Sequence, residues 1–217
     1  MVRRIPKAAG GFSLVELMLA LSLGLTLSGA MLQGLLAEGQ ASMRFTRLLR
    51  ERAHQRRTLE LVKADVQRAT VVSAAPELEQ HGCSLAGRLP VLHLSTAAGA
   101  ITYSVGAAPS GIWRGQVLMR CGPAFGLDGS LSTGSQPQNR VVIDGLAPKP
   151  PVWTGCLAVL GNQQVLAEDL AGSSARPFSA CLDPESGLVA IRLQQEFPAT
   201  QAKVQQIGSE LLAGAGV

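Results

Sequence analysis

The chain has 217 residues and a formal net charge of +4, and 47% of its residues are hydrophobic. This length accommodates one membrane segment and one domain of ordinary size but excludes two large domains, and the 24 glycines and 12 prolines argue against a helical bundle. The charge does not indicate a polyanionic ligand, because Arg3, Arg4 and Lys7 supply three of the positive charges in a segment that processing can remove.

The first element in chain order is an apolar run over residues 12–37, in which Glu16 is the only charged residue. At about 1.5 Å per residue, a helix of this length spans a hydrocarbon core of roughly 30 Å. By the positive-inside rule, the basic residues before the run predict a cytoplasmic N-terminus and an exported remainder. A secretory signal peptide is the competing interpretation, but its small-residue cleavage site follows the apolar part. Here the small residues 8–11 precede the run, so cleavage beside them keeps the helix.

The start of this run, GFSLVELMLALSLG, resembles the type IV prepilin N-terminus of pilins and of type II secretion pseudopilins. The resemblance covers residues 1–27, with a basic leader, the Gly11-Phe12 junction, a serine, a Leu-Val pair, Glu16 and a leucine-rich helix. It implies that a prepilin peptidase cleaves after Gly11 and methylates the new amino terminus of Phe12. It also implies that Glu16 meets the Phe12 amine of a neighbouring subunit during filament assembly.

The energetics of a charge in a membrane make a partner for Glu16 reasonable. An ionised carboxylate at the centre of a membrane helix costs about 2.5 to 3.5 kcal/mol on insertion scales, and the cost is lower near the interface. A positive amine one helical turn away is therefore a suitable partner. The simpler interpretation is that Glu16 only snorkels to the interface at a helix N-terminus, where negative charge is favoured in any case.

One feature departs from the prepilin pattern. Many pilins carry a proline further along the mature helix, whereas this chain has no proline between residues 13 and 75. Instead, glycines recur at intervals of five, at Gly24, Gly29, Gly34 and Gly39. Each glycine weakens an exposed helix by about 1 kcal/mol relative to alanine, which would permit local unwinding. Close packing of membrane helices is the other interpretation, and the sequence does not separate the two.

Beyond Glu38 the helix is expected to continue, because apolar residues recur at steps of three and four. Arg52 and Gln55 interrupt this apolar face, and Pro76 closes the segment. A helix over residues 12–72 would be about 90 Å long, which is far longer than a compact domain requires. Its lower part, 59–72, is therefore expected to pack on the exported domain, in the ladle arrangement known for pilins.

Basic residues crowd the same part of the helix: Arg44, Arg47, Arg50, Arg52, Arg56, Arg57, Lys63 and Arg68. A solvated helical face is the simplest interpretation. The functional alternative is pairing with acidic helices of neighbouring pilins. Nucleic acid is a weaker third alternative, because no aromatic residues interleave with the basic ones to stack on bases.

Residues 76–217 are predicted to form a β-rich head domain. Short strands are expected at 91–96, 100–105, 116–121, 140–144, 156–160 and 188–193, with Gly99 turning the first pair into a hairpin. The predicted fold class is therefore α+β, with a long N-terminal helix packed on a mostly antiparallel sheet. The predicted organisation is a leader at 1–11, a membrane span at 12–37, an exported helix at 38–75 and the head, with a loop at 126–139 and a flexible C-terminal tail.

A second, looser resemblance lies in the head and in the helix before it. The segments TLELVKADVQRAT and ITYSVGAAPSGIWRGQVLMRC look like the minor-pilin group that includes the J-type pseudopilins and the W-type pilus assembly proteins. A generic pilin domain is the alternative.

The four cysteines, Cys83, Cys121, Cys156 and Cys181, all lie in the part that is expected to be exported. Thiols are oxidised there, so two disulfides are predicted. Chain proximity favours Cys83 with Cys121 and Cys156 with Cys181, although three pairings are possible. A zinc site that includes His81 is the competing idea, but no second close pair of ligands exists.

Catalytic motifs are missing from the sequence, which contains no nucleophile elbow, no His-Glu-x-x-His and no phosphate loop. His54 and His93 are expected to be solvated and structural, respectively. We therefore expect no enzyme activity, no cofactor and no metal. Two classes of function remain: a pilin-like filament subunit whose partners are other pilins, the prepilin peptidase and the inner membrane, or a membrane-anchored exported binding or enzymatic domain. In the first class the head is periplasmic and then part of a filament or the cell surface.

Overall fold

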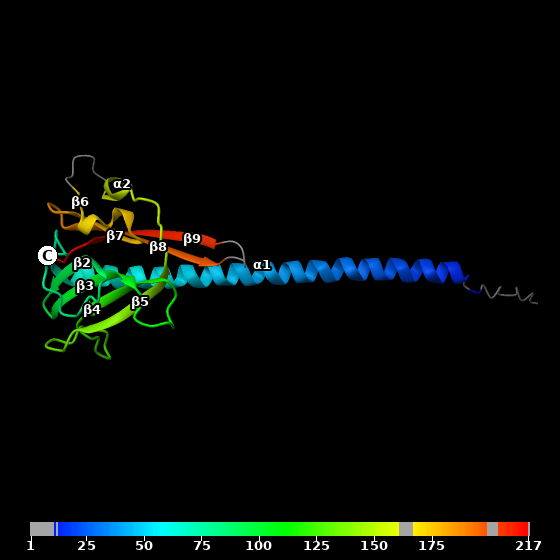
Figure 1. Ribbon diagram of the computed structural model, residues 1–217, viewed down its shortest axis with the longest axis horizontal. Helices are drawn as coiled ribbons and strands as arrows, with labels where there is room; N and C mark the ends of the chain where they lie inside the picture. The colour runs from blue at the N-terminus through cyan, green and yellow to red at the C-terminus, as the bar shows by residue number, and fades with distance from the viewer. Residues whose placement is uncertain (1–10, 12, 161–166, 199–203, 217) are drawn as a thin grey trace, which may run out of the picture. The chain divides into compact units, whose positions relative to one another are not determined.

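The structure is a computed structural model that describes residues 11, 13–160, 167–198 and 204–216. The chain divides into two compact units, Met1–Leu49 and Arg50–Val217. One helix, α1 (Leu14–Arg68), forms almost all of the described part of the first unit and the first element of the second (Figure 1). The leader expected at 1–11 lies outside the described residues except for Gly11.

The second unit is a long antiparallel sheet around the last turns of α1. Its strands are β1 (Ala69–Val72), β2 (Leu89–Thr96), β3 (Gly99–Ala107), β4 (Gln116–Gly122), β5 (Gln138–Leu146), β6 (Glu168–Asp169), β7 (Phe178–Asp183), β8 (Leu188–Pro198) and β9 (Val204–Gly214). Within the described residues the order is β1-β2-β3-β4-β5-β8-β7-β6, and β9 pairs with the other edge of β8. The predicted α+β class with an antiparallel sheet is confirmed.

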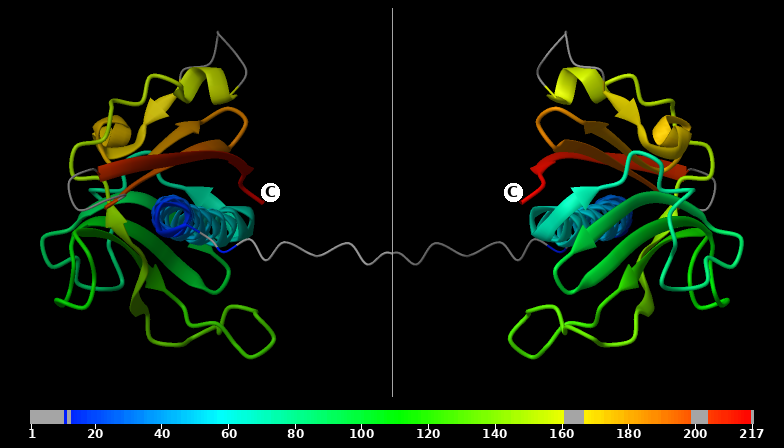
Figure 2. Two further views of the ribbon diagram at one scale, coloured as in Figure 1. Left: turned by 90° about the vertical axis from the view of Figure 1, so that its right-hand side faces the viewer. Right: turned by 90° about the vertical axis from the view of Figure 1, so that its left-hand side faces the viewer.

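The main core lies between the sheet and residues 50–68 of α1. Leu59, Val62 and Val66 are buried in one cluster with residues from both halves of the sheet, such as Leu92 and Ile191. The sheet curls about this stretch of helix, as the end-on views in Figure 2 show. Because the three helix residues recur at steps of three and four, they form a stripe that faces the sheet.

The helix ends earlier than the sequence predicts. It was expected to reach Val72, but it stops at Arg68, and the next four residues form the edge strand β1, which pairs with β2. Thr70, Val71 and Val72 are β-branched, so they lose side-chain freedom in a helix and are favoured in a strand. Residues 69–72 therefore pair with β2 in the sheet, although the spacing of their apolar residues also fits a helix.

Five of the six predicted strands are confirmed, in β2, β3, β4, β5 and β8. The predicted hairpin at Gly99 is also present, because Thr96 pairs with Gly99 across a two-residue turn. Gly99 has φ +133°, a value that side chains other than glycine rarely adopt. The Thr96 hydroxyl donates to the Gly99 carbonyl at 2.7 Å and closes the turn.

The sixth predicted strand, at 156–160, is wrong. These residues form the short helix α2 (Cys156–Leu160). Cys156 and Leu160 lie four residues apart and pack with Trp153, Cys181 and Ala190 in a second apolar cluster. The alternation that indicates a strand is absent, because the two packed residues follow the helical period.

Four strands were not predicted, namely β1, β6, β7 and β9. Every residue of β7 is buried, so it lacks the alternation of a half-exposed strand. In β9 the partly or fully buried positions alternate with exposed ones and include Gln205 and Ser209, whose polarity conceals the pattern. Residues 204–214, at the C-terminal end where a flexible tail was expected without defined bounds, form a strand that pairs with β8 along its whole length.

Two disulfides join the outer surface of the sheet to the segments that cover it. Cys83 bonds to Cys121 with a Cα–Cα distance of 5.9 Å, and Cys156 bonds to Cys181 with a distance of 6.3 Å. The structure therefore has the pairing that chain proximity favours. The first bridge ties the segment before β2 to β4, and the second ties α2 to β7.

Candidate membrane and assembly helix

The start of α1 has the geometry of a capping box. The Ser13 backbone N–H donates to the Glu16 Oε2 at 3.0 Å, and the Glu16 backbone N–H donates to the Ser13 hydroxyl at 3.4 Å. A serine that precedes a helix, with a glutamate three residues later, satisfies two otherwise unpaired backbone donors in this way. Glu16 therefore has a partner inside its own subunit, as the simpler interpretation of this carboxylate requires.

The contact that the prepilin resemblance implies for Glu16 involves a residue that is not described. Phe12 lies outside the described residues, and Gly11 is exposed beside it. The cleavage after Gly11, the methylation of Phe12 and the intersubunit contact of Glu16 thus stay predictions.

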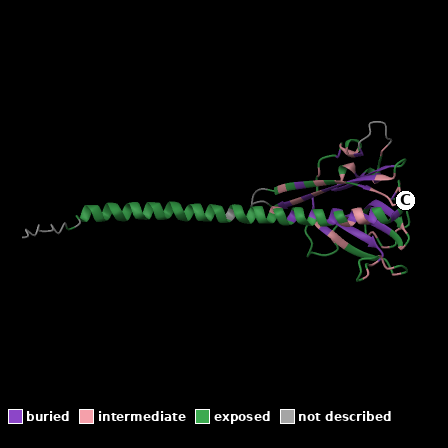
Figure 3. Cartoon of the chain, turned by 180° about the vertical axis from the view of Figure 1, so that it is seen from behind, coloured by how far each residue is buried: buried purple, intermediate pink, exposed green. Residues whose placement is uncertain are grey.

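Residues 14–36 of α1 expose large apolar side chains on every side of the helix, as the continuous green stretch in Figure 3 shows. Leu14 is 74% exposed, Leu25 66% and Met31 70%. A helix that is apolar all round is stable in a membrane or in the interior of an assembly, but not in water. The hydroxyls of Ser22 and Thr26 donate to carbonyls three residues earlier, at 2.9 Å each, so these polar groups need no external partner.

The four glycines in this helix do not share one face. Gly24, Gly29, Gly34 and Gly39 are five residues apart, and each step of five residues turns an α-helix by about 140° beyond a full turn. A close-packing motif of small residues has a spacing of four, which keeps them on one side. Apart from the neighbouring backbone of the helix itself, a Cβ atom at any of the four positions would have no described atom within 4 Å. The four glycines therefore lie on different faces of the helix, and each leaves one position on its face without a side chain.

The part of α1 in the second unit carries a buried charge cluster. Asp65 is fully buried, and it accepts hydrogen bonds from Arg120 Nε at 2.6 Å and from the Tyr103 hydroxyl at 2.7 Å. Arg68 lies one turn away, 3.6 Å from the Asp65 carboxylate. Burial raises the pKa of Tyr103 well above its ordinary value, and the neighbouring Asp65 charge raises it further. Both the charge and the hydrogen bonds of Asp65 are therefore satisfied across α1, β3 and β4.

Gln55 ties the same helix to the last strand. Its side chain is fully buried, and it donates to the Ile207 carbonyl at 3.1 Å and accepts from the Ser209 hydroxyl at 2.8 Å. Within the described residues β9 pairs with β8 alone, so Gln55 attaches α1 to a strand at the edge of the sheet. The residue that interrupts the apolar face in the sequence is thus a contact to β9.

The basic residues of the second unit's helix divide by exposure. Arg50, Arg52, Arg56 and Arg57 are exposed and make no ion pair within the described part of the chain. A solvated face is the simplest reading of this geometry, and pairing with a neighbouring subunit stays a prediction. His54 is also exposed, as expected.

The histidines of the head do not form a metal site. His81 and His93 both contact the Thr102 hydroxyl through Nδ1, at 3.2 and 2.8 Å. Burial lowers the pKa of His93, and the nearby Glu79 raises it by less. Across the described residues no group of three or more histidine, cysteine, aspartate or glutamate side chains is arranged to hold a metal.

Comparisons of the chain with protein-family models, with curated proteins and with solved structures find no match. The molecule itself supports a coarser statement. The helix is long and apolar enough to cross a membrane, with a mean hydropathy of 1.8 over its best window, and the head carries two disulfides. Together these features indicate a membrane-anchored, exported protein with a pilin-like combination of helix and sheet.

Proposed function

We propose that this protein is a structural subunit, a minor pilin or pseudopilin, of a type IV pilus-like or type II secretion filament. A prepilin peptidase cleaves it after Gly11 and methylates Phe12. The short leader is cytoplasmic and the head is periplasmic until the subunit leaves the inner membrane for the filament. The protein acts by assembly with other pilins, and it is not an enzyme.

The observation that carries this proposal is the contrast within α1. Residues 14–36 expose apolar side chains in all directions, whereas Leu59, Val62 and Val66 of the same helix are buried in the core of the head. A simple anchor needs only about 20 apolar residues and no continuous helix into a domain. A filament subunit requires both, because its apolar helix must move from lipid into contact with other helices while the head stays folded.

The test is the chemistry of the mature N-terminus. Mass spectrometry of the protein purified after expression of the full-length gene should find a chain that begins with N-methylphenylalanine at Phe12. Replacing Gly11 with tryptophan should leave the complete precursor in the membrane, because the peptidase requires a small residue at the cut. Substituting Gly10 with alanine is the matched control, since it changes the neighbouring glycine and should be processed normally. An intact leader on the wild-type protein would contradict the proposal.

A second candidate function is favoured by the capping box. If Glu16 exists only to close the N-terminus of α1, no neighbouring subunit is needed to explain it. The protein would then be a membrane-anchored exported domain that binds or transforms a ligand. Such a protein would keep its leader and would not co-purify with pilins.

A further inference from the structure

The loop between β3 and β4 exposes two large apolar side chains. Ile112 is 81% exposed and Trp113 is 37% exposed, and they are consecutive residues at the turn of the loop. The other tryptophan of the chain, Trp153, is only 6% exposed. A tryptophan and an isoleucine that lie side by side at a loop tip form a small apolar patch, and such patches are typical of contact sites. We call these two residues the β3–β4 tip.

The tip is held rigidly from below by Arg114. The Arg114 backbone N–H donates to Asp144 Oδ2 at 2.9 Å, and its guanidinium Nη2 donates to Asp144 Oδ1 at 3.4 Å. The same Nη2 donates to Glu51 Oε1 at 3.2 Å. Gly145, with φ +65°, donates its backbone N–H to the Arg114 carbonyl at 2.7 Å. These bonds fix both backbone groups of the residue that follows Trp113.

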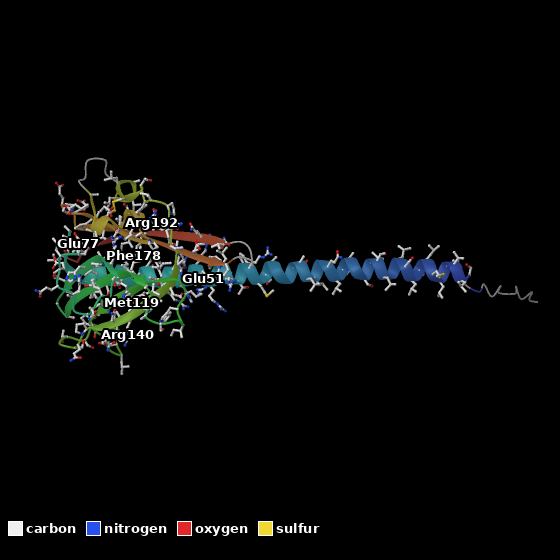
Figure 4. All side chains as sticks on the ribbon, in the orientation of Figure 1. Glu51, Glu77, Met119, Arg140, Phe178 and Arg192 are labelled. Carbon is white, nitrogen blue, oxygen red and sulfur yellow. A yellow bond between two sulfur atoms is a disulfide. The ribbon has the colours of Figure 1, made fainter. Side chains whose placement is uncertain are left out.

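The position of the tip is set by the helix. Glu51 belongs to α1 and is 5% exposed, and Figure 4 labels it at the border of the sheet. The contacts of Arg114 with Glu51 and Asp144 therefore join the loop to both α1 and β5. A contact surface whose geometry is already fixed loses little entropy on binding, so this arrangement favours recognition over mere solvent exposure.

The charges under the tip are unequal. The carboxylates of Glu51 and Asp144 carry two negative charges, and the guanidinium of Arg114 carries one positive charge. These three groups together carry one net negative charge. A partner with apolar side chains and nearby cations would complement both the tip and its base, because the face of an indole ring attracts cations.

A surface of that chemistry lies on the described part of α1. In the first unit, α1 exposes Phe45 at 61% and Leu49 at 51%, which lie on one helical face, and Arg44 is exposed beside them. We propose that the β3–β4 tip docks on this segment, residues 43–49, of a neighbouring copy of the protein. The inference rests on the proposed function, and it names the contact by which a head recognises the next helix.

Such a contact is heterologous, since a loop of one copy meets a helix of another. Contacts of this kind leave the same two surfaces free at the ends of the assembly, and they build open filaments rather than closed dimers. The tip and the segment would therefore be used once each by every interior subunit.

The experiment is a cysteine cross-link between two full-length copies. A tagged copy carries Ile112→Cys, and an untagged copy expressed in the same cells carries Phe45→Cys. The four native cysteines are all in disulfides, so the introduced thiols are the only free ones in the chain. Mild oxidation should give a disulfide-linked dimer of the tagged and untagged copies. The matched control replaces Ile112→Cys with Leu127→Cys, because Leu127 is even more exposed but belongs to another loop.

The outcomes separate the two proposals. Cross-linking from position 112 but not from position 127 supports the docking contact. In that case Trp113→Ala should reduce the co-purification of tagged and untagged full-length copies about tenfold or more, and Leu127→Ala should leave it unchanged. Three results would overturn the docking contact. They are equal cross-linking from both positions, a dimer formed only by two Ile112→Cys copies, and a shift in Trp113 fluorescence that needs only lipid vesicles. If the copies co-purify and position 112 does not cross-link, the docking contact is wrong while the filament function stands. If no copies associate and the leader is intact, the filament function itself fails.

Discussion

Two carboxylates on one helix show how differently the two units of this protein treat charge. Glu16 lies in the exposed apolar part of α1 and is bound by the backbone and hydroxyl of Ser13, three residues away. Asp65 lies in the part of α1 that packs in the head, and its partners Tyr103 and Arg120 come from distant strands. Among the described residues the first carboxylate has only a local partner, whereas the second has partners that exist only when the head is folded.

The difference separates a group that is available for assembly from one that is committed to the fold. A carboxylate with two long-range buried partners cannot leave them without a large penalty. The Glu16 carboxylate is exposed, and within the described residues its hydrogen-bond partner is the Ser13 backbone N–H. Under the proposed function Glu16 changes partner when a neighbouring subunit arrives, whereas Asp65 keeps its partners in the head. Four predictions test this distinction.

The largest expected effect concerns Glu16. Glu16→Leu should be processed after Gly11 and remain in the membrane, yet it should lose its association with filament partners almost completely. The apolar side chain inserts at least as well as the carboxylate, but it offers no charge to the Phe12 amine of a neighbour. Cross-linking or pull-down against co-expressed pilins measures association, and N-terminal mass spectrometry measures processing.

Glu16→Gln is the matched control for that variant. Glutamine preserves the capping box and removes the charge, because glutamate and glutamine both serve at this position. Loss of association in both variants identifies the charge as the assembly contact. If Glu16→Gln associates like the wild type, capping is the only role of the residue, and the anchored-domain function gains support.

The next effect concerns Asp65. Asp65→Leu should destabilise the head by about 3 to 5 kcal/mol, because it leaves the Arg120 guanidinium buried without a counter-charge. The double variant Asp65→Leu/Arg120→Met should recover most of this loss. Arg68→Ala is a surface control that should change stability by less than about 1 kcal/mol, since Arg68 is 40% exposed. Thermal unfolding of the detergent-solubilised chain measures all three, and equal losses for Asp65→Leu and Arg68→Ala would contradict the assignment.

The sequence predicts the helix and the fold class because both follow from local patterns. The apolar run, the charge asymmetry at its start and the spacing of Leu59, Val62 and Val66 are each visible within a few turns of helix. The partners of Asp65 are not, because Arg120 is separated from it by 55 positions. A signal did exist, since Asp65 falls beside the apolar stripe between Val62 and Val66. A carboxylate at that place requires a buried partner, but the neighbouring sequence does not identify which residue the partner is.

The same limit applies to the strands and the capping box. Gln55 and Ser209 pair across 154 positions, and β9 is held by this contact and by its pairing with β8, neither of which is visible in its polar sequence. The Ser13–Glu16 box is local, and the Ser-x-x-Glu spacing predicts it, but the same glutamate also fits the prepilin pattern, and the spacing does not decide between the two roles. Long-range polar contacts and the choice between two roles of one residue are therefore beyond the reach of local sequence patterns.

The third effect is the loss of head stability when either disulfide is removed. Loss of either bridge should destabilise the head by about 3 to 4 kcal/mol on the chain-entropy model, slightly more for the pair separated by 38 residues than for the pair separated by 25. Cys83→Ser/Cys121→Ser and Cys156→Ser/Cys181→Ser, compared by thermal unfolding, measure the two losses. Free thiols in the purified, non-reduced wild type would contradict the prediction, and so would unchanged melting temperatures.

The smallest effect at neutral pH is the titration of Tyr103, which reports on the buried carboxylate directly. Tyr103 is the only tyrosine of the chain, so ultraviolet absorbance at the phenolate band follows this residue alone. Burial and the Asp65 charge both disfavour the phenolate, so the pKa of Tyr103 in the folded state lies well above the ordinary value of 10.0. Its contribution to stability is therefore complete below pH 10 and is lost as the pH rises above it, because the unfolded state releases the proton first.

We expect the native protein to show no phenolate signal near pH 10, and the urea-unfolded protein to titrate there. In Asp65→Asn the charge is removed while the burial remains, so the native pKa should fall but stay above that of the unfolded chain. Glu16→Gln should leave the titration unchanged, because its carboxylate has only local partners. A native Tyr103 that ionises like the unfolded chain would show that Asp65 is not held in a buried cluster. The contrast between the two carboxylates of α1 would then lose its physical basis.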